Sequence, residues 1–117
     1  MLTSFGRALR KIRIDQGEIL KDMANTLGVT SSYLSAVENG KRAIPESWEE
    51  IILTEYQLDN EQERTLRQAV IESIDSIRMN VADEPFAKKE VAFAFARMVA
   101  DLPEDKLTEI KKILGGE

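Results

Sequence analysis

The stretch from Leu27 to Arg42, LGVTSSYLSAVENGKR, most constrains the fold, because it specifies a tight turn followed by one short helix. Gly28 tolerates the positive φ at which a preceding helix ends. The hydroxyl of Thr30 can accept a hydrogen bond from a free amide in the first turn of the next helix. The pair Asn39-Gly40 ends that helix with residues that also tolerate positive φ. A short helix over 31–39 is therefore expected directly after the turn.

This short helix has two different faces. Leu34 and Val37 lie about one turn apart and predict an inward apolar face. The opposite side carries only small side chains, most of them with hydroxyls: Ser31, Ser32, Ser35 and Ala36. The pattern predicts a helix that is held on one side and left free on the other.

Apolar residues at helical spacing predict helices along most of the chain. Besides the helix at 31–39, the expected helices span residues 4–15, 19–27, 45–56, 61–75, 86–100 and 104–114. Pro45 suits the first turn of the helix that it opens. The expected fold class is therefore all-α, with one domain at 1–58 and a helical extension at 59–117.

One segment departs from helical spacing. Ile77, Met79 and Val81 alternate with Arg78, Asn80 and Ala82, a pattern typical of a short strand near 76–82. A lone strand needs a partner for its backbone groups, and the same strand of a second subunit would supply one. The alternative is that the preceding helix continues to Met79.

The composition excludes several kinds of chemistry. The chain has no cysteine and no histidine, which removes thiol nucleophiles, disulfides, imidazole bases and nearly every zinc site. Its carboxylates fall on the polar faces of the expected helices, so we expect no enzyme activity and no cofactor. The start, MLTSFGRALRK, has no apolar run typical of a signal peptide, and no segment could span a bilayer. A cytoplasmic protein that does not enter membranes is expected.

The helices at 19–27 and 31–39, joined by Gly28-Val29-Thr30, have the arrangement of a helix-turn-helix. Three motifs extend the match: ALRKIR in the first helix, MANTLGVTSSYLSAVENGKR across the turn, and PESWEEII after it. Residues 4–58 therefore resemble the Cro-like phage-repressor family of DNA-binding domains, also called the xenobiotic-response-element family. The resemblance covers roughly half of the chain and implies a bundle of about five helices that binds double-stranded DNA.

The resemblance implies roles for single residues. Ser31 and Ser32 take positions at which the family reads base edges in the major groove, and Ala36 takes the next such position. The residues that it places at DNA bases or phosphates are Lys21, Thr30, Ser31, Ser32, Tyr33, Ser35, Ala36, Asn39, Lys41 and Arg42. Arg13 and Glu38 match a pair that often forms an internal salt bridge in this family, so we assign Arg13 to structure rather than to DNA.

The chain departs from the family at one position early in the second helix. Many members carry a glutamine there that anchors a phosphate, and this chain has Leu20. Either that phosphate contact is missing, or Lys21 supplies a substitute. The reading side chains are also weak discriminators: serine hydroxyls both donate and accept, and Ala36 can touch only a thymine methyl. DNA shape would then carry part of the specificity.

Charge is distributed unevenly. Residues 1–44 carry seven Lys and Arg against four Asp and Glu, a net charge of +3. The other 73 residues carry nine against 17, a net charge of −8. Because phosphates respond to the field within about 8–10 Å, a basic N-terminal face on an acidic body is compatible with DNA binding.

The C-terminal half is expected to join two copies of the chain. The expected helix at 86–100 is apolar nearly all round, which predicts burial on more than one side. The residues assigned to dimerisation are Ile77, Met79, Val81, Phe86, Phe93 and Phe95. A two-fold dimer would match two half-sites about 34 Å apart. The alternative is that these helices pack on their own monomer.

The function expected is therefore a sequence-specific transcriptional regulator of double-stranded DNA, a dimeric repressor that reads the major groove with the helix at 31–39. An alternative is an antitoxin that binds a toxin protein through its C-terminal region and represses its own operon. The two functions are compatible with each other.

Overall fold

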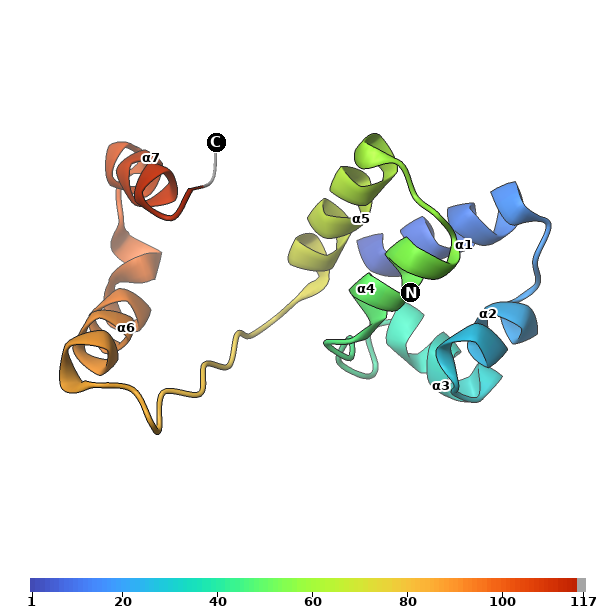
Figure 1. Ribbon diagram of the computed structural model, residues 1–117, viewed down its shortest axis with the longest axis horizontal. Helices are drawn as coiled ribbons and strands as arrows, with labels where there is room; N and C mark the ends of the chain where they lie inside the picture. Colours follow the sequence, from blue (N-terminus) through green and yellow to red (C-terminus); the bar gives the residue numbers. More distant parts are fainter. Residues whose placement is uncertain (116–117) are drawn as a thin grey trace. The chain divides into compact units, whose positions relative to one another are not determined.

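The computed structural model describes residues 1–115, and its regular elements over that range are all helical (Figure 1). This confirms the all-α class. The chain divides into an N-terminal unit, Met1–Ile77, and a C-terminal unit, Arg78–Glu117. The helices of the N-terminal unit are α1 Ser4–Gln16, α2 Leu20–Leu27, α3 Ser31–Glu38, α4 Trp48–Glu55 and α5 Asn60–Ser73. The C-terminal unit holds α6 Phe86–Met98, the 3-10 helix η1 Val99–Asp101 and α7 Glu104–Ile113.

Local chemistry sets several of the helix ends. The Thr30 hydroxyl accepts a hydrogen bond from the Tyr33 amide over 3.0 Å, so the expected cap of α3 is confirmed. Gly28 ends α2 with φ at 72°, as expected. The start of α4 was predicted wrongly, because Pro45 opens a turn, its carbonyl accepts from the Trp48 amide, and the helix begins only at Trp48.

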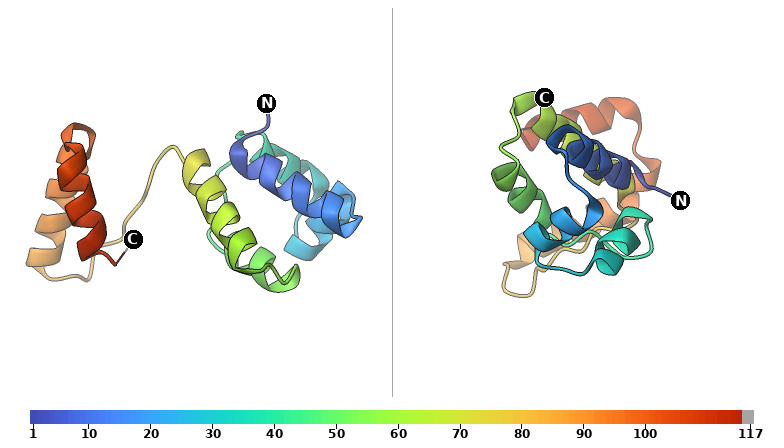
Figure 2. Two further views of the ribbon diagram at one scale, coloured as in Figure 1. Left: turned by 90° about the horizontal axis from the view of Figure 1, so that it is seen from above. Right: turned by 90° about the vertical axis from the view of Figure 1, so that its right-hand side faces the viewer.

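The core of the N-terminal unit receives side chains from all five of its helices. The buried side chains that form the apolar core cluster are Phe5, Leu9, Met23, Ala24, Leu27, Leu34, Val37, Trp48, Ile52, Tyr56 and Leu66. Figure 2 shows α5 running beside α1, and the two helices are in extensive contact. These contacts make α5 a full member of the unit.

The boundary between the two units lies after Ile77, not after residue 58, where the sequence pattern predicted it. Leu66 and Ala69 of α5 are buried. The Phe5 amide, near the start of α1, donates to the Ser73 hydroxyl at the end of α5 over 2.9 Å. The break at Leu58 is therefore a loop within one unit, because the apolar face that follows it packs on α1.

The strand expected near 76–82 is absent, and so is the helical alternative that reached Met79. Helix α5 ends at Ser73, and Ile74 is extended with ψ at 140°. No strand occurs within residues 1–115. Ladder hydrogen bonds need a second strand, and a single chain offers none to residues 76–82.

Residues 78–115 of the C-terminal unit form no core of their own. Among its described residues, 78–115, none is buried, so the expected burial of α6 on several sides is not met by this chain alone. The exposed large apolar side chains are Met79, Phe86, Val91, Phe93, Phe95, Met98, Val99, Leu107, Ile113 and Leu114. A segment of this size rarely folds without a partner, a metal or a disulfide.

A hydrogen bond inside the N-terminal unit joins Tyr56, the residue after α4, to Glu18 in the loop after α1. The Tyr56 hydroxyl donates to the Glu18 carboxylate over 2.7 Å. Burial, and then this hydrogen bond, raise the pKa of Tyr56 from 10.0 to about 12. Because the raised pKa favours the protonated phenol in the folded state, its stabilisation is complete below pH 10 and is lost between pH 10 and pH 12.

Over residues 1–115, no helix combines the length and the apolar character needed to cross a membrane.

Candidate nucleic-acid interface

Helix α3 separates its side chains into a buried face and an open face. Leu34 and Val37 point into the core, at 0% and 1% exposed. Ser32 on the other side is exposed, and Ser31, Ser35 and Ala36 are half-buried. The structure therefore places the four residues predicted for the outer face together on the open face.

These residues line a shallow hollow of about 370 Å³ on the surface of the N-terminal unit. Its lining residues are Leu20, Ser31, Ser32, Ser35, Ala36, Asn39 and Lys41. All but Leu20 were singled out from the sequence as DNA contacts. Leu20 enters from the first turn of α2, so the hollow is shared by both helices of the predicted helix-turn-helix.

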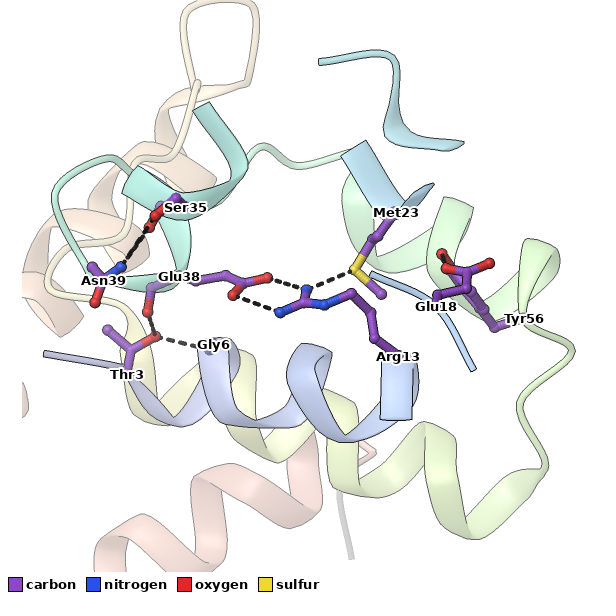
Figure 3. A network of polar contacts seen from close by, with 9 residues as sticks. All are labelled: Thr3, Gly6, Arg13, Glu18, Met23, Ser35, Glu38, Asn39 and Tyr56. Atoms are coloured by element: carbon purple, nitrogen blue, oxygen red, sulfur yellow. Dashed lines mark hydrogen bonds and ion pairs between the residues drawn. The ribbon is translucent and has the colours of Figure 1, made fainter. Parts of the chain in front are cut away.

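A buried ion pair fixes the end of α3 to α1 (Figure 3). The Arg13 guanidinium donates to both carboxylate oxygens of Glu38, with Nη2 at 3.1 Å from Oε1. Its Nη1 also lies 3.3 Å from the sulfur of Met23 on α2. Arg13 and Glu38 are only 6% and 2% exposed, so the salt bridge that the resemblance implied is present, and Arg13 does not face solvent.

Hydrogen bonds hold the backbone of Glu38 as well as its side chain (Figure 3). Its carbonyl accepts from the Thr3 amide over 2.9 Å and from the Thr3 hydroxyl over 3.1 Å. Gly6 lies against the same carbonyl, and a Cβ on Gly6 would stand 2.3 Å from that oxygen. Sequence reasoning missed Gly6, although a glycine inside an amphipathic helix is a signal of close helix approach.

Lys41 and Arg42, expected at phosphates, are both exposed in the loop after α3. The Arg42 guanidinium lies over the Tyr33 ring, 5.0 Å from its centroid. That ring meets Trp48 edge-on at 6.0 Å. Tyr33 is therefore a half-buried platform that connects the core to Arg42, and it does not line the hollow with the serines.

Thr30 and Lys21 were also predicted to contact DNA but do not line the hollow, and the Asn39 side chain, which does, is hydrogen-bonded within the protein. The Thr30 hydroxyl is engaged in capping, and Lys21 is exposed but outside the lining. The Asn39 side-chain amide donates to the Ser35 carbonyl over 2.9 Å, as Figure 3 shows, so it braces the end of α3.

Two basic residues of α1 lie on the side that faces α5. Arg7 and Lys11 line a groove with Thr65, Gln68 and other residues of α5. Arg7 also donates to the Leu2 carbonyl and to the Ser4 hydroxyl. The excess positive charge of residues 1–44 is therefore only partly gathered beside α3, where Lys41 and Arg42 supply it.

The residues assigned to dimerisation lie outside any core. Ile77 ends the N-terminal unit at 78% exposed, and Met79 follows at 64%. On α6, Phe86 is 75% exposed and Phe93 is 65% exposed, with the Arg97 guanidinium 5.6 Å from the Phe93 ring centroid. These side chains remain available to a partner, with Phe95 less exposed at 41%.

Comparison of the chain with family models, with curated proteins and with solved structures found no match.

Proposed function

We propose that the N-terminal unit binds double-stranded DNA in a sequence-specific way, with the open face of α3 in the major groove, and that the protein acts as a transcriptional repressor. The observation that carries this proposal is the open face itself. Ser31, Ser32, Ser35 and Ala36 lie together on a helix whose other side is locked into the core. Lys41 follows at the rim of the same hollow.

The dimensions of α3 support a place in the groove. A helix with its side chains is about 10–12 Å across, and the major groove of B-DNA is about 12 Å wide. Large outward side chains would keep the backbone of a helix away from the base edges. The small side chains of α3 would let its backbone approach closely, so the three serine hydroxyls would reach hydrogen-bonding atoms of the bases.

The anchoring of α3 supports the proposal energetically. The Arg13–Glu38 pair, the Thr3 contacts and the buried Leu34 fix the helix before any ligand arrives. A preorganised surface loses little conformational entropy on binding, and this raises affinity without further contacts.

The test is an electrophoretic mobility shift with the full chain and DNA from upstream of its own gene. Lys41→Ala should weaken binding to all sequences alike and reduce the salt slope by about one, because it removes one phosphate contact. Ser31→Arg should change the sequence preference, since it places a long charged side chain in the groove. The matched control is Lys11→Ala, an equal loss of charge on the α5 side of α1. Equal effects of Lys41→Ala and Lys11→Ala would place the DNA elsewhere.

We further propose that the C-terminal unit joins two copies of the chain. Its described residues bury no side chain, and α6 presents Phe86, Val91 and Phe93 to solvent. Residues 78–117 carry seven basic and eight acidic groups, a net charge of −1, so charge repulsion does not oppose self-association. A two-fold dimer would present two copies of α3 to two half-sites, and linking two weak contacts raises the total affinity.

Sedimentation equilibrium tests the dimer. The unaltered chain should sediment at twice its 13.2 kDa, and Phe93→Asp should sediment as a monomer, because it places a charge in the shared apolar surface. Ile71→Asp on α5 is the matched control, since Ile71 is 67% exposed and Phe93 is 65% exposed. A monomeric unaltered chain would contradict the dimer. A stable complex with a second, different protein would instead favour the antitoxin alternative, which the same exposed surface on α6 supports.

A further inference from the structure

Leu20 is the lining residue of the hollow that has no assigned role. It is the first residue of α2, and its side chain packs partly on the core while it also faces the hollow. Ala36, on the open face of α3, lines the same hollow. Two apolar groups from two helices therefore border a space that is otherwise lined by polar groups.

The polar groups in the hollow do not discriminate well between bases. The hydroxyls of Ser31, Ser32 and Ser35 can each donate or accept a hydrogen bond. The Asn39 amide is engaged with the Ser35 carbonyl at 2.9 Å. Lys41 is exposed at the rim, where it would meet phosphates. With Asn39 engaged and Lys41 assigned to phosphate, the remaining polar side chains of the hollow are serines, which cannot bind a guanine or an adenine in a bidentate way.

The apolar groups fit one base. Thymine is the base that presents a methyl group in the major groove, beside the O4 acceptor. A serine hydroxyl can donate to O4, and apolar side chains can cover the methyl. The other three bases carry no methyl group in the major groove, so Leu20 would have no such group to cover.

On the basis of the DNA binding proposed above, we infer that Leu20 and Ala36 enclose the 5-methyl group of a thymine, and that Leu20 is a specificity-determining residue. Burial of one methyl group corresponds to about a fourfold change in Kd. Two half-sites in a dimer would compound this to more than tenfold.

The experiment uses the full chain and a duplex selected by it from a random-sequence pool. Each thymine is replaced in turn by deoxyuridine, which lacks only the methyl group, and Kd is measured by mobility shift. One thymine in each half-site should lose about fourfold in affinity on replacement. Leu20→Ala should bind the thymine duplex more weakly and should no longer distinguish thymine from deoxyuridine at that position.

Two further variants separate contact from folding. Leu20→Gln keeps the length of the side chain and should also lose the discrimination, and the fluorescence of the buried Trp48 checks that each variant is folded. Ile19→Ala shortens the adjacent apolar side chain, which is 65% exposed and outside the hollow, and should keep the full difference between thymine and deoxyuridine.

The outcomes are distinct. If the full chain retains no duplex from the pool, the proposed function fails. If it binds DNA but no single thymine is sensitive to deoxyuridine, or if Leu20→Ala weakens both duplexes equally and keeps their ratio, DNA binding stands and the methyl contact is overturned.

Discussion

Replacing Arg13 by methionine should lower the free energy of unfolding of the N-terminal unit by about 3–5 kcal/mol. The substitution removes both hydrogen bonds to the Glu38 carboxylate and leaves that carboxylate buried without a counter-charge, in a residue that is only 2% exposed. A buried charge without a partner costs far more than the net value of the pair. Urea denaturation followed by Trp48 fluorescence measures the effect, since Trp48 is the single tryptophan and is buried in this unit.

Two variants check the reason for this loss. Arg10→Met removes an exposed arginine from the same helix and should change stability by less than about 0.5 kcal/mol. The double variant Arg13→Met with Glu38→Leu removes both charges and should recover most of the loss, because no buried charge remains. Similar losses for Arg13→Met and Arg10→Met would show that the buried pair contributes little.

The second large effect is expected from Gly6→Ala, which should destabilise the unit by about 3 kcal/mol, the upper end of typical overpacking costs. Helix propensity alone predicts the opposite sign, since alanine in a helix is better than glycine by about 1 kcal/mol. The new Cβ, however, would lie 2.3 Å from the Glu38 carbonyl oxygen. That oxygen belongs to backbone held by two hydrogen bonds from Thr3, so α1 has to move away from α3.

Gly17→Ala is the control for this prediction. Gly17 has φ at +69°, and a Cβ there would meet nothing within 4 Å. Its cost should be only the backbone strain of about 1–2 kcal/mol for a left-handed residue. Thermal unfolding by circular dichroism compares the two variants with the unaltered chain. A Gly6→Ala variant as stable as the unaltered chain would mean that α1 and α3 are not in close contact.

The parts of the fold that depend on neighbouring residues could be predicted from the sequence. Thr30 caps α3 because its hydroxyl is placed there by the local chain, and Gly28 ends α2 because only a glycine adopts that φ without cost. The open face of α3 followed from helical periodicity alone. These features need no knowledge of the remainder of the molecule.

The parts that depend on packing between distant segments could not be predicted in the same way. The apolar stripe of α5 predicts that one face is buried, but periodicity does not say that α1 covers it, so the boundary was placed too early. Tyr33 looked like a groove residue from its position on α3, and only the approach of Trp48 makes it a platform for Arg42. The net charge of residues 1–44 likewise does not say that Arg7 and Lys11 line a groove with α5.

The side chains that hold α3 in the core are different from those on its open face. Leu34, Val37 and Glu38 keep the helix in place, whereas Ser31, Ser32 and Ala36 contribute little to that task. Mutations on the outer side would therefore carry a small thermodynamic penalty. If α3 reads DNA as proposed, a lineage with this scaffold could acquire a new target by one or two substitutions and remain folded throughout.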